Sequence, residues 1–276
     1  MVPNKTKAVV FTAPGKVELW EFEVRKPDVE DVIVEVEYSG ISLGTERWIL
    51  LGERPEDTRY PHVPGYQSVG KIIYVGPKVK GFKIGDRVCG GVSKLIDDKK
   101  ISGWGAHIQY AVIPAKQLVK VPKNVSMLEA SMHWLFAVGY RGVRMTNIKN
   151  KDLVVIIGLG IIGQGFAQIA RLKGAKVIGS DISEERLKIA KKYSCDIVVN
   201  PIKKNLVDLV KKEKSEGADV VVEAIGKNDL IPTCVKLLRI EGKLVWQGWY
   251  PGNVSFHCHD IQDKRIYMVF PCYLEG

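Results

Sequence analysis

Hydrophobic positions along the chain follow two different patterns. From residue 7 to 125, short β-branched runs alternate with Gly, Pro and Asp, as in KAVVF, DVIVEVEYSG, GKIIYVG, DRVCGG, AHIQYAVIP and QLVKVP. Such runs are typical of the strands of a small all-β domain. From about Leu128, helical segments alternate with buried strands instead. This change predicts two domains, residues 1–127 and residues 128–276, as the length also favours.

The second half has the pattern of a parallel α/β sheet. Five runs are apolar along almost their whole length, as expected of strands buried on both faces. Amphipathic segments such as Ser183 to Tyr193 lie between them. The alternating order predicts a parallel sheet with helices on both sides and ligands at the carboxyl ends of its strands. The predicted strands are 152–157, 175–180, 195–200, 218–224 and 242–248.

A glycine-rich turn follows the first of these strands. The sequence from Val154 to Gly165 reads VVIIGLGIIGQG and contains GxGxxG just before a helix predicted over residues 161–172. Its glycines permit a tight turn, a close approach of pyrophosphate to the backbone, and packing of the helix on the strand. The first amides of the helix would then bind the phosphates. The predicted phosphate-binding positions are Gly158, Gly160, Ile161, Ile162 and Gly163.

An acidic residue ends the next predicted strand. Asp181 is placed to accept hydrogen bonds from the adenosine ribose hydroxyls. A 2′-phosphate about 4 Å from this carboxylate would be repelled by roughly 4 kcal/mol at an effective dielectric near 20. The sequence therefore favours NAD over NADP, although Arg186 would offset part of the repulsion. The alternative is a structural turn whose aspartate caps the helix that begins at ISEERL.

Longer motifs resemble the medium-chain dehydrogenase/reductase family, which includes alcohol and sorbitol dehydrogenases. The matching stretches are 34–46, 61–88, 154–192, 220–226 and 237–248. The resemblance implies an N-terminal GroES-like β-barrel with the catalytic groups and a C-terminal Rossmann doubly wound parallel sheet that binds NAD. It also implies that this Rossmann domain is C-terminally short for the family. The positions implied to face the nicotinamide half are Ala224, Ile225, Gly226 and Gln247.

Positions that bind zinc in this family carry other residues here. Aligning GISLGTE (Gly40 to Glu46) with the family motif G-I-C-G-T-D places Leu43 at the cysteine, and Tyr66 replaces the histidine of G-H-E. Neither is a usual zinc ligand. Val92 to Ser102 also lacks the four cysteines that hold a structural zinc. We therefore expect no zinc. The two motifs resemble the zinc-less branch with the bacteriochlorophyllide dehydrogenases, which implies oxidation of a secondary alcohol on a bulky ring.

Hydride transfer without a metal needs hydrogen-bond donors that polarise the substrate oxygen and carry its proton. Thr45 matches the family hydroxyl that passes this proton towards the cofactor ribose; the alternative is a turn hydroxyl bonded to its own backbone. His133 is a candidate general base, or a core histidine. Tyr66 is either a donor to the substrate or a packed aromatic. Glu46 is expected to bond the backbone or Arg47.

The other Cys and His residues give little support for a metal site. Five cysteines are scattered without a CxxC pair, which argues against a disulfide framework and a cysteine-built zinc site. The sequence FHCHD would place His257 and His259 on one face of a strand, but no spaced fourth ligand accompanies them.

Net charge and hydropathy indicate which classes of binding partner this chain is expected to lack. The net charge is +10, but glutamates are interleaved with the lysines and no aromatic ladder accompanies them, so solvated helix faces are favoured over a nucleic-acid surface. No apolar run is long enough to span a bilayer, and MVPNKTK lacks a signal-like apolar region. We expect a cytoplasmic protein without nucleic-acid or membrane partners. The apolar segment RIYMVF (265–270) would be a sheet edge, which relatives bury in dimers, so we expect a homodimer or larger homo-oligomer.

The leading hypothesis is an NAD-dependent, metal-free alcohol dehydrogenase with a small-molecule substrate. A quinone or enone reductase is the first alternative, although Asp181 argues against its usual NADPH preference. A dinucleotide-binding protein without catalysis is the second.

Overall fold

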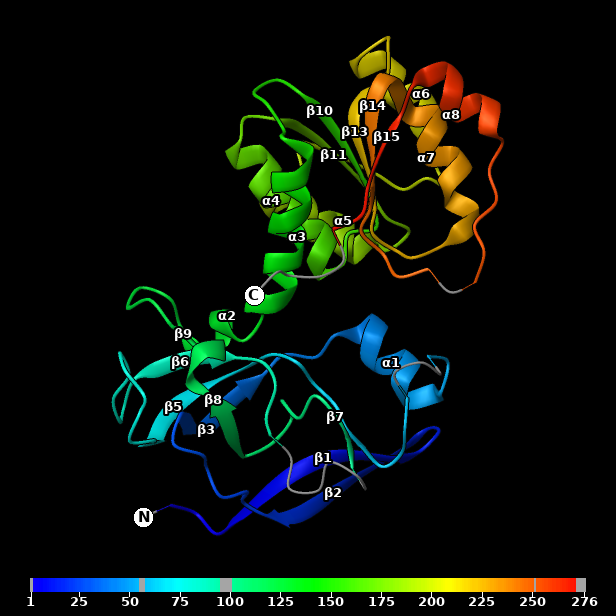
Figure 1. Cartoon of the computed structure of the whole chain (residues 1–276). Helices are drawn as coiled ribbons and strands as arrows, with labels where there is room; N and C mark the ends of the chain where they lie inside the picture. The colour runs from blue at the N-terminus through cyan, green and yellow to red at the C-terminus, as the bar shows by residue number, and fades with distance from the viewer. Residues whose placement is uncertain (1, 55–57, 95–100, 251, 272–276) are drawn as a thin grey trace. The chain divides into compact units, whose positions relative to one another are not determined.

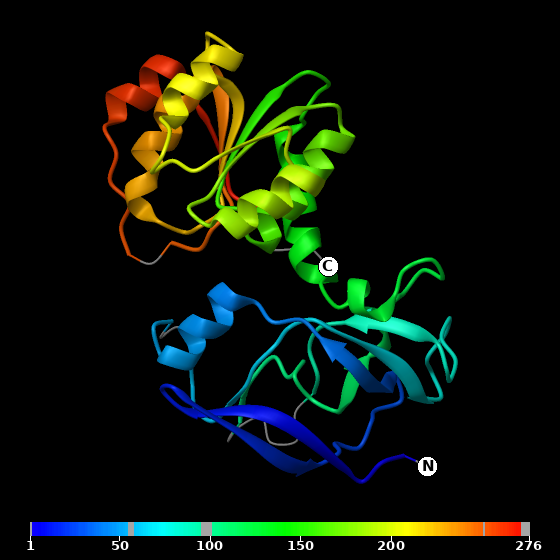
Figure 2. The same ribbon diagram turned by 180° about the vertical axis from the view of Figure 1, so that it is seen from behind.

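The structure consists of two compact units. The computed structural model describes residues 2–54, 58–94, 101–250 and 252–271. The units are Met1–Trp134 and Leu135–Gly276 (Figure 1, and from behind in Figure 2). Helix α2 (Met127–Ala130) falls in the first unit because its side chains share a small apolar cluster with Val69 and Val121. The sequence pattern placed the boundary at the start of this helix.

Two mostly antiparallel sheets form the first unit. Its strands are β1 (Lys5–Ala13), β2 (Lys16–Glu23), β3 (Asp31–Ser39), β4 (His62–Val63), β5 (Ser68–Val75), β6 (Arg87–Gly90), β7 (Ser102–Gly103), β8 (Tyr110–Pro114) and β9 (Val119–Lys120). One sheet has the order β2-β1-β4-β7 and the other β8-β3-β5-β6-β9. Side chains from both sheets, including Val10, Val32 and Ile72, meet in one apolar cluster. Apolar side chains on the inner face of each sheet therefore pack together, and the two sheets enclose a shared core.

Two segments of the first unit differ from the strand pattern. Helix α1 (Leu43–Leu51) interrupts the all-β region and ends at Gly52, whose φ of +73° forms a left-handed cap. The run AHIQYAVIP forms a regular strand only from Tyr110. The residues before it bond elsewhere: the amide of His107 donates to the carbonyl of Pro64. A short 3-10 helix, η1 (Ala115–Gln117), follows β8.

One parallel sheet organises the second unit. Its strands are β10 (Leu153–Ile157), β11 (Lys176–Ser180), β12 (Ile197–Val199), β13 (Ala218–Glu223), β14 (Leu238–Trp246) and β15 (Tyr267–Val269). They lie in the order β12-β11-β10-β13-β14-β15, and every adjacent pair is parallel. The direction of winding reverses between β10 and β13. In a doubly wound sheet, ligands bind outside the carboxyl ends of the strands at this point.

Helices cover both faces of the sheet (Figure 1). The helices are α3 (His133–Thr146), α4 (Ile161–Leu172), α5 (Glu184–Tyr193), α6 (Leu206–Glu213), α7 (Ile231–Leu237) and α8 (Cys258–Lys264), with a short 3-10 helix η2 (Asn228–Leu230). Successive residues of β10 point into two different cores. Val154 and Ile156 share a cluster with side chains of α3, α4 and α5, whereas Val155 and Ile157 share one with side chains of α6 and α7. Both faces are apolar, which explains the near-continuous hydrophobic runs. In the part of the chain that is described, no helix combines the length and hydropathy needed to cross a membrane.

A buried ion cluster secures the amino end of β13. Asp219 is 6% exposed. Its carboxylate lies 2.7 Å from Nζ of Lys214 and 2.6 Å from Nε of Arg239, and it accepts a hydrogen bond from the amide of Leu153 at 2.7 Å. Burial alone would raise the pKa of Asp219, but these donors hold it below its ordinary value.

We expect Asp219→Asn to lower the free energy of unfolding by about 2 kcal/mol at pH 7, because two cations and an amide lose their acceptor. Since the folded pKa is depressed, the contribution is complete above the unfolded pKa near 4 and is lost as the pH falls through the folded value. The loss should therefore shrink below about pH 4. Urea denaturation followed by circular dichroism measures it. Glu184→Gln, which breaks an exposed pair with Lys203, should change stability by less than about 0.5 kcal/mol. Equal losses of stability in the two variants would contradict the stabilising role of the Asp219 ion cluster.

Candidate functional site

The glycine turn after β10 is fixed by close packing. Gly158 has a φ of +96°, a conformation that favours glycine. A Cβ atom on Gly163 would lie 2.0 Å from the carbonyl oxygen of Gly158, and one on Gly158 would lie 2.6 Å from Cγ1 of Ile225. Both glycines are therefore required for α4 to begin directly against the end of β10.

The first turn of α4 presents free amides. Gly160 is its N-cap, and the first turn holds no acidic side chain. The first helical hydrogen bond runs from the amide of Gln164 to the carbonyl of Gly160, which leaves the amides of the intervening residues without helical partners. A Cβ on Gly160 would meet no atom within 4 Å. This arrangement suits an anion such as a diphosphate. The free amides belong to Ile161, Ile162 and Gly163.

Asp181 lies beside this turn at the carboxyl end of β11. It is 6% exposed. Its Oδ2 accepts from the amide of Leu159 at 2.8 Å, and its Oδ1 accepts from the amide of Ser183 at 2.9 Å. Arg186 Nη1 is 3.6 Å from Oδ2. The side chain that caps α5 is Ser183, whose Oγ accepts from the amide of Arg186. Asp181 thus ties the glycine turn to β11, and each carboxylate oxygen retains acceptor capacity for a sugar hydroxyl.

The loops after β13 and β14 complete this edge of the sheet. Ala224 donates its amide to the carbonyl of Ile157 at 2.8 Å, so the loop containing Ile225 and Gly226 lies against the glycine turn. Gln247 is buried, and its amide donates to the carbonyl of Glu223. Its side chain faces α3, where Nε2 donates to the carbonyl of Val138 at 3.4 Å. Any contribution of Gln247 to a ligand at this edge would therefore come from its main chain.

A buried acid and a tyrosine, not predicted from the sequence, join these two loops. Glu223 is the last residue of β13 and is 0% exposed. It accepts hydrogen bonds from the amides of Ile225 and Gly226 and from the hydroxyl of Tyr250. Burial raises the pKa of Glu223, while these donors oppose the rise. The only signal in the sequence was an acid at the end of an apolar run.

The predicted catalytic residues lie in the first unit around Tyr66. Thr45 is half-buried in α1. Burial raises the pKa of the Tyr66 phenol, and side-chain hydrogen bonds with Ser42 and Thr45 oppose the rise. The Tyr66 ring contacts Trp134 edge-on, with 6.3 Å between centroids, and Trp134 contacts His133 at 6.5 Å. Thr45 therefore lies near Tyr66, and His133 lies near Trp134, which packs against the Tyr66 ring.

His133 is the first residue of α3, and its surroundings favour the neutral ring. Its Nδ1 lies 3.0 Å from the carbonyl of Ala130, so this nitrogen carries the proton and donates. Burial lowers the pKa of His133, which keeps the ring uncharged at neutral pH. Nε2 is then the basic nitrogen, as a general base requires.

Glu46 bonds differently from the sequence prediction in one respect. Its Oε1 accepts from the backbone amide of Ser42 at 2.8 Å, as expected. Its other oxygen is 2.8 Å from Nε2 of His107, rather than beside Arg47. The His107 ring also contacts Ser39 through Nδ1 at 2.8 Å. Glu46 therefore secures α1 to the barrel.

The donor set does not fit zinc at the positions that the family resemblance indicates. Leu43 (69% exposed) and Tyr66 stand there. His257 and His259 flank the start of α8 instead of sharing a strand face, and His259 pairs with Asp263 one turn later at 3.1 Å. Within the described ranges, no group of three or more His, Cys, Asp or Glu side chains is placed to hold a metal ion.

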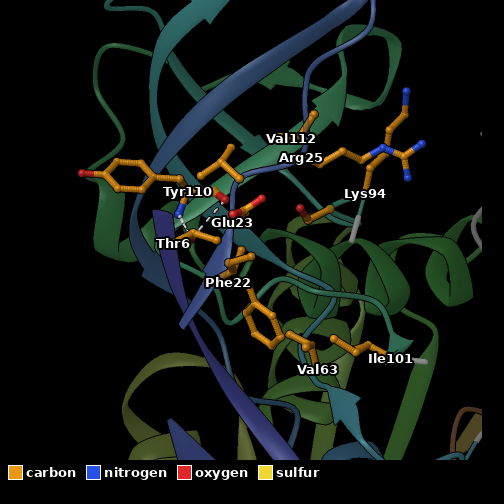
Figure 3. Close-up of a pocket in the computed structure, with 12 residues that line it drawn as sticks. Thr6, Phe22, Glu23, Arg25, Val63, Lys94, Ile101, Tyr110 and Val112 are labelled. Atoms are coloured by element: carbon orange, nitrogen blue, oxygen red, sulfur yellow. Dashed lines mark hydrogen bonds between the residues drawn. The ribbon is translucent and has the colours of Figure 1, made fainter. Parts of the chain in front are cut away.

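A narrow pocket in the first unit lies away from these residues. Figure 3 shows it beside Thr6, Phe22, Val63 and Tyr110, where the amide of Tyr110 donates to Oγ1 of Thr6 at 2.9 Å. Its water-accessible volume is about 20 Å³, room for roughly one water molecule. It is too small for an alcohol substrate and contains none of the predicted site residues.

Two family profiles match separate parts of the chain. Residues 28–123 match an alcohol dehydrogenase GroES-like domain, and residues 162–272 match a zinc-binding dehydrogenase. An alcohol dehydrogenase of Geobacillus stearothermophilus is 29% identical over 261 residues, covering 86% of this chain and 76% of that relative. An uncharacterised zinc-type alcohol dehydrogenase-like protein of Haemophilus influenzae is 30% identical over 282 residues, covering 95% of this chain and 82% of that relative.

A solved structure supports the predicted fold class. A zinc-binding dehydrogenase from Sinorhizobium meliloti bound to NADP matches with a TM-score of 0.87 and 24% identity, covering 97% of this chain and 84% of that one. At this identity the likeness concerns the fold. It confirms a GroES-like N-terminal domain followed by a Rossmann-like parallel sheet.

Two substitutions in the glycine turn should separate folding from binding. Gly163→Ala should lower the free energy of unfolding by about 1–3 kcal/mol, because its methyl group overlaps the Gly158 carbonyl. Gly160→Ala should leave stability within about 0.5 kcal/mol but weaken NAD⁺ binding roughly tenfold or more, because its methyl group would occupy the space a diphosphate needs. Urea denaturation and calorimetric titration measure the two effects. Unchanged affinity in Gly160→Ala would contradict the phosphate site.

Proposed function

The chain belongs to the zinc-type alcohol dehydrogenase-like family of medium-chain dehydrogenases, and from this premise we propose an NAD-dependent oxidoreductase that transfers hydride between an alcohol and nicotinamide without a metal. The observation that carries the cofactor proposal is the position of Asp181. This carboxylate is buried and bonded to the amide of Leu159 inside the glycine turn. A ribose there meets an acceptor, and a 2′-phosphate meets a like charge.

The order of the strands supports one orientation of the dinucleotide. Asp181 follows β11, and the free amides of α4 follow β10. With the adenosine ribose at the first and the diphosphate at the second, the nicotinamide half extends over the ends of β13 and β14. The loop residues there are Ala224, Ile225, Gly226 and Gln247, through their backbone.

The proposed chemistry of the first unit uses neutral hydrogen-bond donors. The bound cofactor supplies or accepts the hydride. The hydroxyl of Thr45, near the Tyr66 phenol, is proposed to carry the substrate proton, and the ring of His133, whose pKa is lowered by burial, to act as its base. Because Leu43 and Tyr66 replace zinc ligands, hydrogen bonds take over polarisation of the substrate oxygen. A bulky secondary alcohol is the proposed substrate class.

The edge strand β15 supports a proposed homodimer. β15 lies at the end of the sheet order, beside β14, and Tyr267 and Phe270 are 58% and 54% exposed. Among the described strands, β15 has a partner on one side only, and such an edge with apolar side chains is suited to pairing with a second copy of the chain.

Calorimetric titration with NAD⁺ and NADP⁺ tests the cofactor proposal. Wild-type protein should bind NAD⁺ at least tenfold more tightly, a smaller ratio than the bare charge repulsion predicts because Arg186 lies beside Asp181. Asp181→Ala should weaken NAD⁺ binding and bring the ratio near one. Glu185→Ala serves as the control, because Glu185 is an exposed acid in the first turn of α5, close to Asp181 in sequence. A ratio unchanged in Asp181→Ala would overturn the proposal.

Turnover of secondary alcohols tests the chemistry. Thr45→Val should lower kcat by about a hundredfold or more because the proton route is lost, and Thr45→Ser should restore most of it.

A metal chelator should leave the wild-type rate unchanged. Activity that disappears with chelation and returns with zinc would contradict the metal-free site. Reduction of quinones or enones with no alcohol oxidation would favour the reductase alternative, and NAD⁺ binding without any turnover would favour a non-catalytic protein.

A further inference from the structure

Glu223 is a buried carboxyl group whose hydrogen-bond partners favour the ionised form. Its Oε1 accepts from the amide of Ile225 at 3.0 Å, and its Oε2 accepts from the amide of Gly226 at 2.9 Å and from the hydroxyl of Tyr250. Amides can only donate, so both oxygens act as acceptors and neither needs to carry a proton. The side chain is completely enclosed, at 0% exposure.

Among the described residues, no Lys, Arg or His forms an ion pair with this carboxylate. The contrast with Asp219, four residues earlier on the same strand, is direct. Asp219 has Lys214 at 2.7 Å and Arg239 at 2.6 Å. The groups that face Glu223 are the Tyr250 phenol, the Cys234 thiol and loop amides. A buried charge without a counter-charge is unfavourable, and such groups concentrate at sites where a ligand supplies the opposite charge.

Glu223 lies where the winding of the sheet reverses. It is aligned with Ile157, the last residue of β10, and the glycine turn touches the loop that follows it, since a Cβ on Gly158 would meet Ile225. Asp181 directly follows β11, which pairs with β10 on its other side. A dinucleotide whose adenosine ribose meets Asp181 must therefore place its second nucleoside on the side of Glu223.

We propose that Glu223 provides the counter-charge for the oxidised nicotinamide ring, so that this site binds NAD⁺ in preference to NADH. This inference rests on the proposed function. The oxidised ring carries a positive charge and the reduced ring is neutral, whereas the diphosphate and riboses are the same in both. A nearby buried carboxylate therefore stabilises one redox form of the ligand without affecting contacts common to both.

The size of the effect follows from Coulomb attraction in a partly buried site. Removing one unit charge at a separation of about 10 Å and an effective dielectric near 20 changes an affinity on the order of tenfold. The loss should fall on NAD⁺ alone. A purely structural role in holding the loops would weaken both redox forms together.

Tyr250 allows the charge to be separated from the hydrogen bonds. Its hydroxyl donates to Glu223, and its ring packs edge-on against Trp246 with 5.0 Å between centroids. Tyr250→Phe removes one donor but leaves the carboxylate charged. Glu223→Gln keeps the shape and removes the charge. Glu223→Asp keeps the charge and shortens the side chain.

The experiment measures dissociation constants for NAD⁺, NADH and ADP-ribose by calorimetry. In wild-type protein, NAD⁺ should bind more tightly than NADH. Glu223→Gln should weaken NAD⁺ by about tenfold and leave NADH within about twofold. Glu223→Asp and Tyr250→Phe should keep the wild-type NAD⁺ to NADH ratio, even where both affinities fall. Asp229→Asn, an exposed acid in the following 3-10 helix, is the matched control and should change neither.

Failure of the charge proposal and failure of the proposed function would give different binding results. Equal weakening of NAD⁺ and NADH in Glu223→Gln, or no change in either, overturns the charge proposal while leaving NAD binding intact. Wild-type protein that binds NADH as tightly as NAD⁺ also overturns it, and this measurement needs no variant and is unaffected if Glu223→Gln does not fold. Wild-type protein that binds neither form, nor ADP-ribose, overturns the proposed function itself.

Discussion

The approach of α4 to the end of β10 is the constraint on which the candidate site depends. A helix can start this close to a strand only where no side chain intervenes, and a Cβ on Gly163 would lie 2.0 Å from the Gly158 carbonyl. The same contact directs the first helical amides toward the carboxyl edge of the sheet. Asp181 then fixes the turn from the side through the amide of Leu159. The fold thus presents backbone amides at this edge, and the first turn of the helix carries no acidic side chain that would repel an anion.

The buried acids at the two ends of β13 have different partners. At the amino end, Asp219 is neutralised by two cations and contributes to stability. At the carboxyl end, Glu223 is satisfied only by hydrogen-bond donors. A fold selected for stability alone would gain by replacing the second carboxylate with an apolar residue. Its position at the point where the winding of the sheet reverses agrees with the proposed role toward a ligand, because proteins keep groups that oppose stability mainly at functional sites.

Much of the fold was predictable because the signals are local. The five apolar runs became β10 to β14, and α4 spans residues 161–172 as predicted, since periodicity and glycine spacing act over a few residues. Contacts between distant residues gave no such signal. Glu46 meets His107, and Glu223 meets Tyr250, only after the chain folds. FHCHD was wrongly expected to be a strand, because alternation over three residues does not distinguish a strand from the first turn of a helix.

If Leu43 and Tyr66 stand in place of zinc ligands, as we propose, the first unit must act on a substrate oxygen through hydrogen bonds alone. A metal draws charge from the oxygen without donating a proton, whereas a hydroxyl polarises it only along a hydrogen bond. On the proposed function, the surrounding groups must therefore stay neutral and able to exchange protons. The structure meets this condition: burial raises the pKa of the Tyr66 phenol and lowers that of His133, so both are uncharged near pH 7. Glu46, the nearby carboxylate, is already engaged by His107 and the Ser42 amide. On this proposal, a proton passed through Thr45 would meet neutral partners, as general acid–base catalysis without a metal requires.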